Sequence, residues 1–125
     1  MAKILWRPNQ INDTHMMKFM DRVNNLYDLD INSYQDLHDW SIKNIPEFWK
    51  EIWNQSEIIH SSTYTDVIDD LHKMPGAKWF SGSRLNFAEN LLRYRNDDIA
   101  IYAKAENLPL RRITYNELFN QVEAL

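Results

Sequence analysis

Residues 14–27 read THMMKFMDRVNNLY, and they carry the clearest structural signal in the chain. Apolar side chains recur here at intervals of three and four residues, at Met16, Phe19, Met20, Val23, Leu26 and Tyr27. That spacing places them along one side of an α-helix, which has 3.6 residues per turn. The sequence therefore predicts a helix that starts near residues 12–14. Its stripe of methionines and aromatic residues indicates a packed core rather than a ligand site.

Two more helices are predicted to follow the first. Ser33 is a suitable N-cap for the second, with Asp36 three residues later as a partial capping box. Pro46 suits the first turn of the third, where its missing N–H costs nothing. Their buried faces are predicted to hold Leu37 and Trp40 in the second helix, and Phe48, Trp49, Ile52 and Trp53 in the third. Residues 55–65 show no periodicity and are predicted to be a loop.

The segment from residue 66 to residue 96 is less regular. A short helical piece with Val67, Ile68 and Leu71 is predicted, ending at the turn signal Met74-Pro-Gly76. Asn86 is a suitable N-cap for another helix, and Glu89 would occupy its third position. That helix is predicted to contain Leu91, Leu92 and Tyr94.

The pattern changes at Asp97. Residues 99–103 form a continuous apolar run, typical of a strand covered on both faces. Residues 104–110 would be a hairpin connection, and residues 111–113 would return as a second strand. Thr114 and Glu117 then form a predicted capping box for a last helix. Its buried face would hold Tyr115, Leu118, Val122 and Leu125. The predicted fold class is α+β, a mainly helical N-terminal layer followed by a β-hairpin and a helix.

Composition favours a folded, soluble chain. Of the 125 residues, 44% are hydrophobic and 26% are charged, so intrinsic disorder is not expected. No run approaches the roughly 20 apolar residues of a membrane span, and the N-terminus reaches a charge and a proline before any apolar stretch. Cysteine is absent, which excludes disulfides and thiolate chemistry. We expect an intracellular, cytoplasmic protein with no membrane partner.

The charge distribution argues against nucleic acid as a partner. The net charge is −4, and its whole acidic excess lies in residues 31–80, which carry four basic and eight acidic side chains. A phosphate backbone would require the opposite balance.

No residue pattern predicts an active site. There is no glycine-rich loop to hold phosphates, and His15, His38, His60 and His72 have no partner at a metal-ligand spacing. The pairs Asp69-Asp70 and Asp97-Asp98 are better interpreted as surface charge than as a cation site. Residues 61–63 (SST) lack a nearby base, and strand alternation would send Arg111 and Arg112 to opposite faces. Accordingly, no catalytic, cofactor-binding or metal-binding residue is predicted.

Several motifs, taken in order, nevertheless resemble a known family. They are WRP at 6–8, YxxLHxWS at 34–41, PEFW at 46–49, MPGAKWF at 74–80 and LNFAENLL at 85–92. This series is similar to the start of the acyl-CoA synthetases, and the last two motifs resemble the acetoacetate branch. Residues 99–102 with 113–118 resemble the opening hairpin and helix of adenylate-forming enzymes in general. The resemblance spans essentially the whole chain.

The resemblance implies an enzyme that joins acetoacetate to coenzyme A at the expense of ATP, with Mg. It implies residues 1–96 as the helical N-terminal region and residues 97–125 as a truncated start of the AMP-binding domain. The family's phosphate loop, hinge aspartate and catalytic lysine lie beyond residue 125, so none is carried onto this chain. We therefore expect a non-catalytic fragment whose partner is the remainder of the ligase.

Two alternatives stay open. The acyl substrate of the same superfamily could be acetate or propionate, since the acyl pocket is not in this sequence. A free-standing helical interaction module is the other. For the truncated end, residues 97–125, we expect self-association as one outcome.

Overall fold

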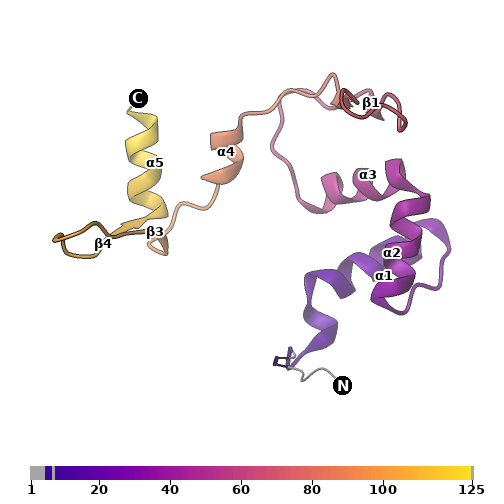
Figure 1. Ribbon diagram of the computed structural model, residues 1–125, viewed down its shortest axis with the longest axis horizontal. Coiled ribbons are helices and arrows are strands. Elements are labelled where there is room, and N and C mark those ends of the chain that lie inside the picture. The colour runs from indigo at the N-terminus through magenta and orange to yellow at the C-terminus, as the bar shows by residue number, and fades with distance from the viewer. Residues whose placement is uncertain (1–4, 7, 125) are drawn as a thin grey trace. The chain divides into compact units, whose positions relative to one another are not determined.

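The computed structural model describes residues 5–6 and 8–124 (Figure 1). Its elements are a 3-10 turn Ile11–Asp13, helices α1 (His15–Tyr27), α2 (Tyr34–Lys43), α3 (Ile45–Gln55), α4 (Phe87–Leu91) and α5 (Tyr115–Glu123), and strands β1 (Asp66–Ile68), β2 (Trp79–Ser81), β3 (Ile99–Ala103) and β4 (Arg111–Thr114). Each strand pair is antiparallel, β1 with β2 and β3 with β4. The predicted α+β class is confirmed.

Contacts divide the chain into two compact units. The first runs as far as Glu57 and includes Asp66–Ser81, and the second comprises Ile58–Thr65 and the chain from Gly82 onward. The predicted division at residue 97 concerns the domains of a protein family rather than contacts within this chain. It stays a prediction.

The three helices of the first unit start near the predicted residues, and side chains cap two of them. The Thr14 hydroxyl accepts a hydrogen bond from the Met17 N–H at 3.3 Å, which fixes the start of α1. The Ser33 hydroxyl accepts from the Asp36 N–H at 3.2 Å at the start of α2. Pro46 lies in the first turn of α3.

The core of the first unit is built from the stripe predicted on α1. Its buried members are Phe19, Met20, Val23, Ile31 and Leu37, with Met17, Tyr27, Trp40, Phe48 and Ile52 packed against them. The Phe19 and Phe48 rings meet edge to face, with centroids 5.7 Å apart, a favoured geometry for aromatic pairs. The helical stripe therefore closes around α2 and α3. Met16 and Leu26 lie at its margins and stay exposed.

One asparagine side chain fixes the connection between α1 and α2. The Asn24 amide accepts from the Ile31 N–H at 2.8 Å and donates to the Ile31 carbonyl at 2.9 Å. Ile31 is itself buried, so without Asn24 both of its backbone groups would be left without these partners. Asp28, in the left-handed region at φ 52°, ends α1 just before this loop.

The predicted helical piece after Asp66 is wrong. Residues 66–68 form β1, which pairs with β2 so that Asp66 lies opposite Ser81 and Ile68 opposite Trp79. The run Asp66-Val-Ile is β-branched at two of three positions, which suits a strand. The ambiguity of short apolar runs explains the error.

In the second unit, the Asn90 side chain plays the same part as Asn24 in the first. The Asn90 side chain accepts from the Ile59 N–H at 2.8 Å and donates to the Ile59 carbonyl at 2.8 Å. Ser61 and Ser62 donate their N–H groups to the Arg84 carbonyl. The segment predicted as a loop is thus held to α4 by the Asn90 side chain and to Arg84 by backbone bonds. Helix α4 ends at Leu91, so the prediction that it includes Leu92 and Tyr94 is wrong.

Asn86 caps α4 as predicted, since its side chain accepts from the Glu89 N–H at 3.2 Å. We expect Asn86→Ala to destabilise this helix locally by about 0.5–2 kcal/mol. Hydrogen exchange of the Asn90 and Leu92 amides should accelerate accordingly, whereas Asn86→Asp, which keeps an acceptor, should leave it nearly unchanged. Equal exchange in the alanine variant and the native chain would contradict the cap.

The hairpin β3–β4 and helix α5 form as predicted. Strand β3 was predicted to be covered on both faces, but among the described residues it is not. Tyr102 is 64% exposed, and Ile101 is exposed as well. Thr114 and Glu117 make the predicted capping box, with bonds of 2.9 and 3.1 Å. The Tyr115 N–H donates to the Asp98 carbonyl at 3.0 Å, which ties α5 to the base of the hairpin. Leu125, predicted on the buried face, lies outside the described residues.

Candidate functional site

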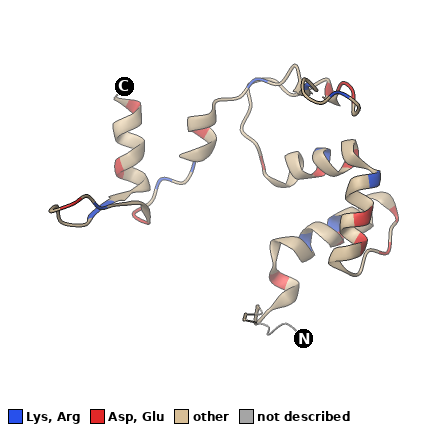
Figure 2. Cartoon of the chain, viewed as in Figure 1, with Lys and Arg blue, Asp and Glu red and all other residues tan. Residues whose placement is uncertain are grey.

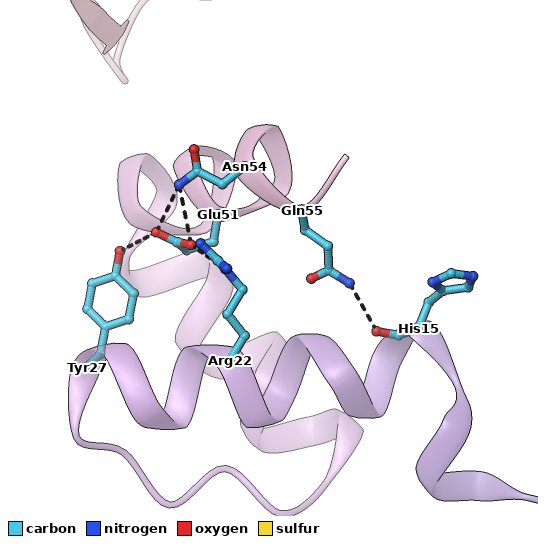
Figure 3. Close-up of polar contacts among 6 residues, drawn as sticks. All are labelled: His15, Arg22, Tyr27, Glu51, Asn54 and Gln55. Atoms are coloured by element: carbon cyan, nitrogen blue, oxygen red, sulfur yellow. Dashed lines mark hydrogen bonds and ion pairs between the residues drawn. The ribbon is translucent and has the colours of Figure 1, made fainter. Parts of the chain in front are cut away.

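The buried charged side chain of the first unit is Glu51 on α3, only 3% exposed. Figure 3 shows three side chains converging on its carboxylate. The Arg22 Nε–H donates to Oε2 at 2.8 Å, and the Tyr27 hydroxyl donates to Oε1 at 3.3 Å. The Asn54 amide lies 3.5 Å from both oxygens. The cluster therefore joins α1 to α3 through one carboxylate.

The electrostatics of this cluster follow from its burial. An isolated buried carboxylate is strongly unfavourable, and a charged partner with further hydrogen bonds offsets that cost. Burial raises the pKa of the Tyr27 hydroxyl, and the adjacent Glu51 carboxylate raises it further. Tyr27 therefore stays a neutral donor to Glu51 at physiological pH.

The Glu51 cluster stabilises the fold and has no geometry for catalysis. A general base must reach a substrate proton directly or through one water. Both oxygens of Glu51 are instead engaged by protein donors in a site almost closed to solvent. What the arrangement can do is hold two helices at a fixed separation.

Sequence reasoning missed Glu51. Glu51 follows Phe48 by three positions and Glu47 by four, so a helical wheel places it at the edge of the apolar face of α3, beside polar residues. An acidic residue in that position is ordinarily exposed, so its burial has little signal in the sequence. The identity of the partner, 29 residues away in the sequence, has no such signal.

Beside this cluster, Gln55 reaches across from the end of α3 to α1. Its Nε2 donates to the His15 carbonyl at 3.4 Å (Figure 3). Its Oε1 is buried and has no hydrogen-bond partner within the structure.

The histidines lie on different segments of the chain. His15 begins α1, and His38 is an exposed residue of α2 whose Nδ1 is 3.5 Å from the Asp39 carboxylate. His72 lies in the connection between β1 and β2, and His60 belongs to the second unit. Across residues 5–6 and 8–124, His, Asp and Glu side chains nowhere gather in a group of three that could hold a metal ion.

One aspartate of each pair makes local hydrogen bonds. Asp69 accepts from the Lys78 N–H at 2.8 Å and pairs with the Lys73 ammonium at 2.8 Å. The Lys73 hydrogen bond, followed by the Lys78 N–H, lowers the pKa of Asp69 from 3.8 to about 2. In the other pair, Asp98 accepts from the Asn96 side-chain amide at 2.7 Å. The interpretation of the two pairs as surface charge stays a prediction.

Asp69 gives the connection between β1 and β2 a defined acid response. Because its folded pKa is depressed, its contribution to stability is fully present above pH 3.8 and is lost as the pH falls towards 2. We expect the Lys78 amide to lose exchange protection across that window, and Asp69→Asn to lack the transition. An NMR titration of the Asp69 carboxyl carbon with a midpoint near 4 would contradict the assignment.

The other residues considered in the sequence analysis make local contacts. The Ser61 hydroxyl donates to the Arg84 carbonyl and Ser62 to the Thr63 carbonyl. Arg112 lies over the Tyr102 ring at 5.9 Å. Lysine and arginine residues are spread over several elements of the described chain (Figure 2). Among the helices described, none has the length and apolar character needed to cross a bilayer.

The comparisons with known proteins agree with one another. Residues 34–91 match the family model described as the acetyl-coenzyme A synthetase N-terminus. The acetoacetyl-CoA synthetase of Xenopus tropicalis is 41% identical over 124 residues, covering 97% of this chain and 18% of that protein. The malonamoyl-CoA synthetase of Penicillium aethiopicum is 46% identical over 91 residues, covering 72% of this chain and 13% of that protein.

A solved structure agrees with the sequence matches. Acetoacetyl-CoA synthetase from Streptomyces lividans superposes with a TM-score of 0.81 at 31% identity, over 99% of this chain and 20% of that chain. This chain thus spans about a fifth of the length of the relatives that it matches.

Proposed function

The chain is homologous to the N-terminal portion of the acetoacetyl-CoA synthetases, and we propose that it forms the N-terminal segment of an ATP-dependent acid–CoA ligase. The reaction would convert acetoacetate and ATP to acetoacetyl-AMP and pyrophosphate. The coenzyme A thiol would then displace AMP to give acetoacetyl-CoA. The observation that supports this proposal is similarity along nearly the whole chain, in sequence and in fold.

Within such a ligase, this segment would contribute packing rather than chemistry. We propose no residue of this segment as a ligand of ATP, Mg or coenzyme A. Gly76 and Gly82 lie in separate turns, at φ 111° and 85°, and make no glycine-rich loop for phosphates. The cofactors would be held by the remainder of the polypeptide, which we propose as the principal partner of this segment.

The identity of the acyl substrate is a more specific part of the proposal. Acetoacetate and malonamate share a carboxylate and a carbonyl at the third carbon, and differ by a methyl group in place of an amide nitrogen. The similarity to a malonamoyl-CoA synthetase therefore supports malonamate as the second candidate. Acetate and propionate lack that carbonyl and are less favoured.

The full reading frame that contains this chain provides the test. We expect the purified ligase to release pyrophosphate with acetoacetate, ATP and coenzyme A at least about tenfold more efficiently than with malonamate, acetate or propionate, because a polar pocket discriminates strongly against a missing hydrogen-bonding group. If the ligase prefers malonamate, malonamate and not acetoacetate is the proposed substrate. If no acyl-CoA product forms, the ligase proposal is rejected. The 125-residue chain alone should not bind Mg-ATP in a calorimetric titration.

Cytoplasmic location and a role in lipid and ketone-body metabolism are further proposals. A cysteine-free sequence suits a reducing compartment, and acetoacetate is itself a ketone body. Imaging of the full-length chain fused to a fluorescent protein tests the location.

A further inference from the structure

An apolar groove crosses the first unit, with a volume of about 450 Å³. One wall comes from the α2–α3 region and the other from the β1–β2 connection. The groove is lined chiefly by Ile42, Ile45, Trp49, Leu71, Met74 and Trp79. Most of these side chains are exposed, and Met74 is 97% exposed. Contiguous exposed apolar surface of this kind marks an interaction site more often than free surface.

The groove is preformed. The Trp49 and Trp79 rings meet edge to face with centroids 5.7 Å apart, which joins its two walls. Asp69 holds the ends of the connection together, because its side chain accepts from the Lys78 N–H and its own N–H donates to the Lys78 carbonyl at 3.1 Å. A preformed surface binds its partner without a large ordering cost.

The chemistry of the groove selects an apolar occupant. Its two polar side chains are already paired, Ser41 with the His38 carbonyl at 2.8 Å and Lys73 with Asp69. Acetoacetate, ATP and coenzyme A all carry negative charge, so this groove does not suit a substrate of the proposed ligase. Leucine, valine or phenylalanine side chains would fill it without leaving a polar group unpaired.

We propose that this groove, named here the Trp49–Trp79 groove, is a docking surface for apolar side chains of the ligase polypeptide outside residues 1–125. The inference rests on the proposed function. Its support is the length of chain concerned: the relatives are about five times longer, and the Streptomyces lividans enzyme keeps this fold as one fifth of its chain. Docking there would fix the N-terminal segment to the rest of the enzyme.

Peroxide oxidation of the native methionines tests the proposal in the full-length chain. Hydrogen peroxide transfers one oxygen to the thioether sulfur, which leaves a sulfoxide and water. Since oxidation follows exposure, we expect Met74 to oxidise at least about tenfold more slowly than free methionine added as a standard. Met20, only 2% exposed, is the buried control. Peptide mass spectrometry reads each site. A Met74 rate within about twofold of free methionine would overturn the proposal.

A charge placed in the groove gives a second measurement. Leu71→Asp should restore rapid oxidation of Met74 in the full-length chain, because its carboxylate would be buried on docking. Tyr34→Asp, an exposed aromatic residue outside the groove lining, is the matched control and should leave Met74 protected. Protection that survives Leu71→Asp would overturn the proposal, as would protection that disappears on dilution, which would indicate a second copy of the chain.

Two results separate this inference from the proposed function. If Met74 is protected but the protein lacks acetoacetate–CoA ligase activity, the docking proposal stands and acetoacetate is rejected as the substrate. Accessible Met74 in an active ligase would reject docking alone.

Discussion

Arg22→Met is expected to lower the free energy of unfolding of the first unit by about 3 kcal/mol, the low end of the cost of removing one partner from a buried ion pair. The low end applies because Arg22 itself is 43% exposed, whereas the Glu51 side chain is 4% exposed. Methionine preserves the aliphatic stem of Arg22 and removes its charge. Urea unfolding followed by tryptophan fluorescence measures this unit, since Trp40, Trp49, Trp53 and Trp79 all lie within it.

The double variant Arg22→Met with Glu51→Leu separates charge from packing. Removing both charges eliminates the desolvation cost, so we expect the double variant to recover most of the lost stability. Lys18→Met, which removes an exposed cation from the same helix α1, is the control and should change stability little. The Glu51→Leu single variant completes the cycle. If the stability loss of the double variant equals the sum of the losses of the two single variants, Glu51 is not held by Arg22.

The helical half of the fold could be predicted because its determinants are local. The α1 stripe, the Thr14 and Ser33 caps and the proline of α3 are each read within a few residues. The same locality explains the capping box of α5. The β1–β2 pair was not predicted because its three-residue strands are defined by partners 11 and 15 residues away in the sequence. No periodicity develops over a strand of that length.

The partly buried polar contacts of the chain could not be predicted from its sequence. Asn24 and Asn90 each bind both backbone groups of one residue, seven and 31 positions away. Asparagine has many surface roles, so neither its presence nor its spacing identifies such a contact. Glu51 lies at the edge of the apolar face of α3, where an acidic residue is ordinarily exposed, and its partners Arg22 and Tyr27 are identified only in the folded structure.

The motifs that carry the family resemblance are rich in apolar and capping residues. Trp79, Phe80 and the residues of α4 form packing and capping contacts in the structure: Phe80 lies against Trp53 with centroids 4.7 Å apart, and Asn86 caps α4. Conspicuous motifs can therefore identify a family through its scaffold. The groove between Trp49 and Trp79 could not be predicted, because it depends on the unrecognised β1–β2 pair.

The hairpin at the end of the chain should behave differently from the helical core. Ile101 and Tyr102 are exposed, and the two-stranded sheet β3–β4 has no third strand within the described residues. A two-stranded sheet is marginal alone, and an apolar edge tends to pair with another chain or to fray. In the 125-residue chain we therefore expect residues 97–125 to mediate self-association or to be the least protected segment.

Hydrogen exchange and light scattering together test this expectation. In a monomer, amides of β3 should exchange at least about a hundredfold faster than those of Phe19 and Val23 in α1, because local opening costs little where few apolar contacts form. If scattering shows oligomers instead, Ile101→Lys should dissociate them, since a charge on an apolar strand face opposes pairing. Lys104→Arg, which preserves charge in the adjacent connection, is the control. A strictly monomeric chain whose hairpin exchanges as slowly as α1 would show that the hairpin needs no partner.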